Sequence, residues 1–182
     1  MLPSSCWVAS MLNGLLLLHG DKNKMSELAY KFLHTVLTDD GVFTSGKRRA
    51  DWITVLDAIQ KHTNIVIKIY MGADVEPALR KLKFRNQIAV CDIDSGGHVV
   101  LLSGRSGGWL EVFDPDWHNV KKRRTKVNAY IVQPEELSQN RRARINLLIN
   151  EDYLIRSGRG GRAEFQMGAV STRTLTILGK RR

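Results

Sequence analysis

The stretch "QIAVCDIDSGGHVVLLSGRSGGWLEVFD", residues 87–114, decides the fold of this chain. It contains three short apolar runs, at 87–93, 98–104 and 109–114, and Gly-rich turns separate them. Apolar runs of this length, bounded by turn residues, are typical of β-strands. The last two runs are joined by "RSGG", whose glycines suit a tight turn. We therefore expect these two runs to form a β-hairpin.

The regions on both sides of this stretch contain helical and strand patterns in a segregated order. The segment 5–18 is nearly all apolar, which predicts a helix buried on most sides. The remaining elements are predicted as helices over 26–37, 51–62 and 74–84, and as strands over 64–70 and 126–132. Because helices come first and strands follow, the order predicts an α+β fold with N-terminal helices packed against an antiparallel β-sheet.

Length and charge set the domain organisation. A chain of 182 residues suits one globular domain with an appendage, and its composition excludes global disorder. The net charge is +10, and residues 121–182 hold 15 of the 28 Lys and Arg but only 5 of the 18 Asp and Glu. The positive charge therefore belongs to the end of the chain. We expect a domain over 1–132 and a basic, partly flexible C-terminal extension over 133–182.

The cysteine count and the first apolar segment bear on the compartment. Two cysteines, Cys6 and Cys91, are too few for a disulfide framework, which favours a reducing, cytoplasmic setting. The apolar run "MLNGLLLLHG" (11–20) is too short to span a bilayer and lacks the basic start of a signal peptide. We expect it to be a buried helix and the protein to have no membrane span, with a secretory signal as the alternative.

Three residues have the types and positions of a nucleophilic site. Cys6 begins the first buried helix, His98 begins a strand, and Asp114 ends the next strand. A helix N-terminus and a nearby imidazolium both stabilise a thiolate, and the imidazole needs a third group to orient it. The predicted hairpin makes His98 and Asp114 cross-strand neighbours. We therefore predict a Cys6–His98–Asp114 catalytic triad, with neither cofactor nor metal.

Other interpretations of these residues remain open. A lone cysteine in an apolar segment is usually a packing residue, and we expect this role for Cys91. Asp116 is an alternative orienting acid, and His118 is a rival base in a loop. A metal site is conceivable, although its spacing matches no zinc signature; it would use Cys91, His98, Asp114 and His118.

The sequence around the triad resembles a known family. "SCW" (5–7), followed by small and apolar residues, resembles the nucleophile motif of papain-like cysteine peptidases. "GHVVL" (97–101) and then "DP" (114–115) are similar to the bacteriocin-processing branch, the leader-cleaving domains of peptide-exporting transporters and their stand-alone relatives. The resemblance covers roughly residues 1–132. It implies a papain-like fold and a peptide or protein substrate, with Cys6 as nucleophile, His98 as general base and Asp114 as orienting group.

Two positions depart from the family pattern. The family has a glycine next to the nucleophile, where this chain has Trp7. It also has a glutamine about six residues before the cysteine, whose amide helps to bind the oxyanion, and that position would precede Met1. We expect the natural start to lie upstream. The alternatives are that Ser4 or Ser5 substitutes for the glutamine, or that the protein is inactive.

The basic segments indicate a second class of function. They are "KKRRTK" (121–126), "RRAR" (141–144) and "RSGRGGR" (156–162). Such segments can neutralise phosphates or dock an acidic protein, but aromatic interleaving and a recognised nucleic-acid-binding module are missing from the sequence. The alternative function is therefore a catalytically inactive papain-like adaptor that binds an acidic partner or nucleic acid. An acyltransferase using the same triad is a further alternative.

Overall fold

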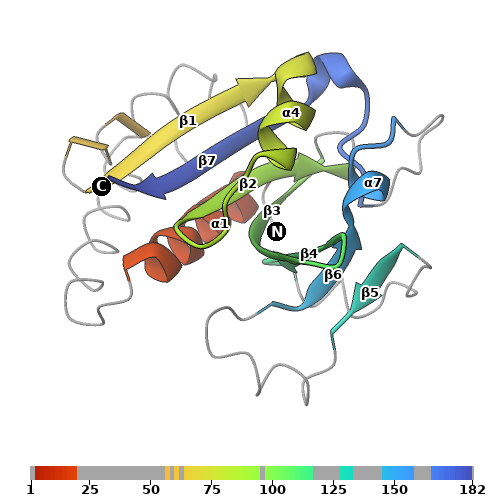
Figure 1. The fold of residues 1–182 in the computed structure, drawn as a ribbon, viewed down its shortest axis with the longest axis horizontal. Coiled ribbons are helices and arrows are strands. Elements are labelled where there is room, and N and C mark those ends of the chain that lie inside the picture. The colour runs from red at the N-terminus through yellow and green to blue at the C-terminus, as the bar shows by residue number, and fades with distance from the viewer. Residues whose placement is uncertain are drawn as a thin grey trace.

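The computed structural model describes residues 3–19, 56–57, 60–61, 64–94, 97–116, 128–132, 145–157 and 165–181. Its elements in chain order are α1 (Pro3–His19), β1 (Ile65–Met71), η1 (Gly72–Asp74), α4 (Val75–Arg80), β2 (Gln87–Ile93), β3 (His98–Ser106), β4 (Trp109–Phe113), β5 (Ala129–Ile131), β6 (Leu147–Asn150), α7 (Glu151–Leu154), η3 (Val170–Thr172) and β7 (Thr174–Lys180). Within these ranges the strands form one antiparallel sheet of seven, in the order β1-β7-β2-β3-β4-β6-β5 (Figure 1). The predicted α+β class, with a helix against an antiparallel sheet, is confirmed.

The central hairpin forms as predicted. Ser106 pairs with Trp109, and the two residues between them, Gly107 and Gly108, have φ angles of 55° and 79°. Two consecutive positive φ angles define the type I′ turn that matches the twist of antiparallel strands, and glycine adopts them without strain. Here β3 extends two residues beyond the predicted end at 104. The turn is also linked to the start of α7, because the Glu151 N–H donates to the Gly108 carbonyl at 2.9 Å.

The prediction of an appendage over 133–182 is wrong for the segments described there. β6 pairs with β4 and β5, and β7 lies between β1 and β2 (Figure 1). A boundary at 132 would therefore divide the sheet. β7 is buried along most of its length, as expected of a strand with a partner on each side. The predicted helix over 26–37 and most of the one over 51–62 lie outside the described residues.

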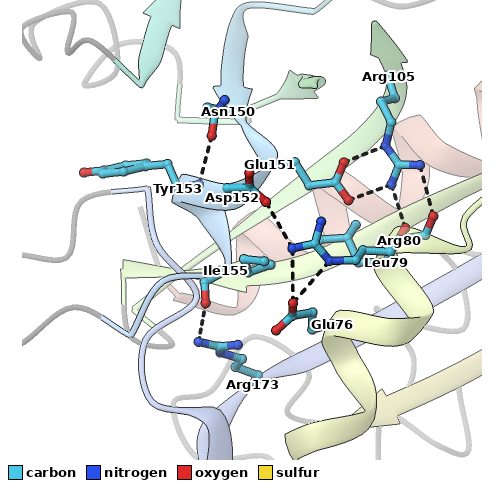
Figure 2. Close-up of polar contacts among 10 residues, drawn as sticks. All are labelled: Glu76, Leu79, Arg80, Arg105, Asn150, Glu151, Asp152, Tyr153, Ile155 and Arg173. Carbon is cyan, nitrogen blue, oxygen red and sulfur yellow. Dashed lines mark hydrogen bonds and ion pairs between the residues drawn. The ribbon is translucent and has the colours of Figure 1, made fainter. Parts of the chain in front are cut away.

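One arginine of this C-terminal region is part of the interior. Arg173 is only 3% exposed. Its Nε donates to the Gly168 carbonyl at 3.1 Å, and its Nη2 donates to the Ile155 carbonyl and, at 3.2 Å, to Ser157 Oγ. Buried polar groups need such partners, because an unpaired guanidinium would carry a large desolvation cost. Arg173 thus joins the start of β7 to the end of α7, as Figure 2 shows for its contact with Ile155.

The sheet has a hydrophobic core on each face. Along β3 the side chains alternate, so that Val99 and Leu101 belong to one core and Val100 and Leu102 to the other. The first core contains the apolar residues of α1, and the second contains those of α4 and α7.

None of the described helices is long and apolar enough to cross a lipid bilayer.

A close contact fixes the course of α1 across its face of the sheet. A Cβ atom at Gly14 would lie 2.4 Å from Ile88 Cδ1 and 3.3 Å from Leu101 Cδ1, so a glycine lets the helix approach β2 and β3. One turn earlier, Ser10 Oγ donates to the Val99 carbonyl at 3.3 Å. The helix therefore follows β3 from Leu101 back towards the residue where that strand begins.

An arginine brace joins the helices on the opposite face. Arg105 contacts Glu151 at two points, with Nε 2.8 Å from Oε2 and Nη2 2.9 Å from Oε1 (Figure 2). Its Nη2 also donates to the Leu79 carbonyl at 2.7 Å, near the end of α4. The guanidinium lies 5.4 Å from the centre of the Phe84 ring. The brace joins β3 to α4 and α7. It therefore fixes the end of the β3–β4 hairpin that is next to its turn.

Candidate active site

His98 and Asp114 form a buried pair at one end of the sheet. His98 is the first residue of β3 and is 8% exposed, while Asp114 follows β4 and is fully buried. His98 Nε2 lies 2.6 Å from Asp114 Oδ1. This is the length of a strong, charge-assisted hydrogen bond. The predicted proximity of the two side chains is confirmed, although the residues are not directly opposite partners.

A β-bulge explains why the two side chains meet. The pairing of β3 with β4 passes from Gly104–Glu111 to Leu102–Val112, so Ser103 is an extra residue. Beyond the bulge Asp114 stands opposite Val100, and His98 lies two residues further along the same face. Without the extra residue, Asp114 would stand opposite Leu101, and His98 would point to the other face. The bulge therefore places the imidazole and the carboxylate on one side of the sheet.

The backbone at the bulge needs Gly104. A Cβ atom there would lie 2.1 Å from Glu111 Oε2 and 2.7 Å from Glu111 Cδ. Ser103 Oγ donates to the Glu111 carbonyl at 3.3 Å. The side chain of the extra residue thus supports the irregular pairing that aligns the site.

Asp114 is held through its backbone as well as its carboxylate. The amide of Asn146 accepts from the Asp114 N–H at 2.8 Å and donates to the Asp114 carbonyl at 2.7 Å. Oδ1, which contacts His98, also accepts from the Asp116 N–H at 2.8 Å. Oδ2 is buried, and within the part of the chain described it has no hydrogen-bond partner. Asp116 therefore contributes a backbone donor, while Asp114 supplies the carboxylate against His98.

The turn before His98 is fixed from the C-terminal region. Asp94 directly follows β2 and has a φ of 53°, and its carbonyl accepts from the Gly97 N–H at 3.2 Å. Its Oδ1 accepts from the Phe165 N–H at 2.7 Å. Phe165 is buried in the core that contains α4 and α7. A segment assigned to the flexible extension in the sequence analysis thus helps to place the residue that begins β3.

The pair leaves one ring nitrogen of His98 for chemistry. A carboxylate that contacts Nε2 favours the tautomer with its proton on Nε2, so the lone pair lies on Nδ1. Nδ1 is then the atom that can accept a proton from a nucleophile and later return it. This is the arrangement that a general base with an orienting acid would require.

Cys6 lies in the core on the α1 side. It is 6% exposed, forms no disulfide, and shares a hydrophobic cluster with Val99. Side chains alternate between the two faces along a strand, so His98 lies on the same face as Val100, and Asp114 on the same face as Val112. Both valines belong to the core that contains α4 and α7. The described contacts therefore join the histidine to the aspartate, and they place the cysteine on the helix that packs over the other face.

The neighbouring cysteine and aspartate on β2 have shifted titration. Burial raises the pKa of the Cys91 thiol, and the charge of Asp92 adds to this. Burial also raises the pKa of Asp92, and this effect outweighs the hydroxyl of Thr174, which donates to Oδ2 and lowers the pKa. Cys91 is 1% exposed within the α4-side core. These properties fit the predicted packing role of Cys91, because a thiol with a raised pKa is a poor nucleophile.

Comparison with known proteins leaves the site to be interpreted on its own geometry. No protein-family model, no curated protein and no solved structure matches this chain. Among the described residues, no three His, Cys, Asp or Glu side chains come together as a metal site would require. His118, the rival base, lies outside the described residues.

Two site features were missed by the sequence analysis. Asn146 is an isolated polar residue before the apolar run of β6, and its proximity to Asp114 follows from the pairing of β4 with β6. Ser103 was assigned to a regular strand. The glycine at position 104 is the signal that could have indicated the bulge, because glycine within a strand often marks one.

Proposed function

We propose that the protein is a cysteine peptidase of the papain-like type, in which Cys6, His98 and Asp114 act as a triad. The observation that carries this proposal is the buried 2.6 Å contact between His98 Nε2 and Asp114 Oδ1. A carboxylate on Nε2 orients the ring and stabilises the imidazolium that forms during the reaction. That arrangement leaves Nδ1 as the nitrogen that serves the thiol.

The course of α1 supports the assignment of Cys6. The helix contacts Leu101 at Gly14 and Val99 at Ser10, so it advances towards the start of β3 as it is followed to its N-terminus. One more turn, about 6 Å of helix, separates Ser10 from Cys6. This brings Cys6 to the level where β3 begins. Cys6 and His98 belong to different faces of the sheet. In the proposed site the thiol therefore reaches Nδ1 past the end of the sheet, where β3 begins.

The reaction would proceed by acyl transfer to the thiol. His98 Nδ1 accepts the Cys6 proton, and the sulfur attacks the carbonyl carbon of a peptide bond. Collapse of the tetrahedral intermediate breaks the C–N bond, and the imidazolium donates its proton to the leaving amine. Water, deprotonated by His98, then hydrolyses the thioester and restores the thiol. The backbone N–H of Cys6 would supply part of the oxyanion site.

The decisive test measures covalent labelling by a peptide probe that carries a thiol-reactive electrophile. The wild type should be labelled at Cys6, and Cys6→Ala should abolish the labelling. Cys91→Ala is the matched control and should label like the wild type, since its thiol is buried on the other face. His98→Ala should slow labelling strongly, because the thiolate loses its general base. Equal labelling of Cys6→Ala and wild type would overturn the proposal.

A second candidate function is supported by the placement of Cys6. A thiol that is 6% exposed in an apolar cluster, on the face opposite to the histidine pair, suits a packing role. The protein would then be a papain-like adaptor whose His98–Asp114 pair is structural and whose basic segments bind an acidic protein or nucleic acid. In that case His98→Ala leaves thiol labelling unchanged, and binding to an acidic polymer weakens steeply with added salt.

A further inference from the structure

Asp114 stands beyond the regular pairing on both sides of β4. The β3–β4 register ends at Leu101–Phe113, and the β4–β6 register ends at Val112–Leu147. A residue past the end of a ladder has backbone polar groups that no strand satisfies, and its side chain is free to change direction. The carboxylate of Asp114 nevertheless has to remain against His98 for the proposed chemistry.

The side chain of Asn146 supplies the missing partner. It binds both the N–H and the carbonyl of Asp114, at 2.8 Å and 2.7 Å, so one amide does what a neighbouring strand residue would do. Asn146 is itself fixed, because its N–H donates to the Val112 carbonyl and its carbonyl accepts from the Val132 N–H. It is only 5% exposed. The amide therefore stands in a rigid, dry position.

The contacts of the carboxylate show why this matters. Oδ1 is shared between His98 Nε2 and the Asp116 N–H, and Oδ2 has no hydrogen-bond partner among the described residues. A carboxylate bound through a single oxygen can rotate about that contact. The Asp116 N–H holds that oxygen, and the orientation of the whole carboxylate towards His98 depends in addition on the backbone to which it is attached.

We propose that Asn146 is a positioning residue of the site, which holds the backbone of Asp114 so that the carboxylate orients His98. This inference rests on the proposed peptidase function. It adds a fourth member, from the residue that precedes β6, to a triad contributed by α1 and the β3–β4 hairpin. Its role is mediated entirely through Asp114, and it contacts neither the thiol nor a substrate in the proposed reaction.

The test compares Asn146→Ala with Asn150→Ala in the full-length protein. Asn150 is the matched control, because it ends the strand that Asn146 precedes and its Oδ1 accepts from the Tyr153 N–H, away from Asp114. The first readout is the Hε2 proton of His98, followed by NMR for its protection from exchange with water. The second is the rate at which Cys6 is labelled by the peptide probe.

We expect Asn146→Ala to lose the protected Hε2 signal and to slow Cys6 labelling by about 100-fold, as for a small misplacement of a catalytic group. Asn150→Ala should keep both. If Asn146→Ala keeps the Hε2 protection and the labelling rate of the wild type, the positioning role is overturned and the peptidase proposal still stands. If wild-type labelling does not depend on His98, the peptidase proposal fails, and the NMR readout still decides whether Asn146 positions the pair.

Two further measurements test the role of Asn146 even if Asn146→Ala does not fold. Asn146→Asp keeps an acceptor for the Asp114 N–H but cannot donate to its carbonyl, so it should weaken the Hε2 protection; unchanged protection would contradict the proposal. In the wild type, the Asp114 amide should exchange with water as slowly as the interior of β4. Fast exchange of that amide would show that Asn146 does not hold it, and would equally overturn the role.

Discussion

His98 and Asp114 share one face of the sheet because Ser103 is an extra residue in β3. The pairing of β3 with β2 fixes the faces of residues 98–102, and the pairing of β4 with β6 fixes those of 109–112. The extra residue shifts the β3–β4 register by one, so that both pairings can form in the same sheet. A single unpaired residue therefore determines whether the proposed base can meet its orienting acid.

Deleting Ser103 should break the site and destabilise the fold. One of the two segments would have to turn its buried side chains to the wrong face, which should cost at least about 3 kcal/mol. Urea unfolding and the Hε2 signal of His98 measure the two effects. Ser103→Ala is the control, since it keeps the residue and loses only the hydrogen bond to Glu111, worth about 1 kcal/mol. A deletion variant with wild-type stability would contradict the assigned bulge.

Asp114→Ala should remove most of the activity. Without a side-chain acceptor on Nε2, the imidazole loses both its orienting partner and the group that stabilises the imidazolium. Removal of the orienting aspartate from a catalytic triad lowers kcat by about 10⁴-fold, and we expect a loss of that order here. Peptide turnover or probe labelling measures it, with circular dichroism as the check on folding. Activity within a few-fold of wild type would exclude Asp114 as the orienting group.

Two arginines should differ strongly in their contribution to stability. Arg105 makes a two-point contact with the nearly buried Glu151, while Arg80 pairs with Glu76 and Asp152 at the surface. Hydrogen bonds to charged groups are worth about 1.5–3 kcal/mol, and we expect Arg105→Met to cost this much. Arg80→Met, the matched control, should cost under about 1 kcal/mol because solvent screens its pairs. Equal costs in urea unfolding would argue against the brace.

Asp92 should make stability depend on pH in the acidic range. Burial raises its pKa in the folded protein, so the fold binds this proton more tightly than the unfolded chain does. The resulting stabilisation is complete below the unfolded pKa and is lost as pH rises through the folded pKa. Asp92→Asn stays neutral and can still accept from Thr174. It should therefore be more stable than wild type at neutral pH, with a difference that shrinks in acid; a constant difference would contradict this.

Gly14 should be the residue of α1 least tolerant of a larger side chain. Its Cα faces Ile88 and Leu101, and a Cβ there already lies 2.4 Å from Ile88 Cδ1. Forcing extra volume into a packed core costs about 1–3 kcal/mol, which we expect for Gly14→Leu in urea unfolding. Adding Ile88→Ala should recover part of this loss, because it opens the space that the new side chain needs. Strictly additive losses would indicate that the two positions do not touch.

The sequence predicted the local parts of the site and missed the non-local ones. The hairpin that carries His98 and Asp114 follows from strand patterns and two glycines, both readable within a short window. Asn146 reaches Asp114 only through the pairing of β4 with β6, which no local pattern indicates. The strand over 174–180 was not predicted, because arginines flank it and made the segment look exposed. One of them, Arg173, is buried, and its partners include Ile155 and Ser157, which are distant in the sequence. The bulge at Ser103 depends on constraints from two other strands.

The position of β7 between β1 and β2 has a consequence for biosynthesis. A nascent chain that has already emerged from the ribosome with β1 and β2 still lacks the strand that joins them. The sheet cannot close until translation has passed residue 180, and both waiting strands expose unpaired edges in the meantime. The sheet should therefore form only after β7 has been synthesised, and until then the growing polypeptide should depend on chaperones that shield those edges.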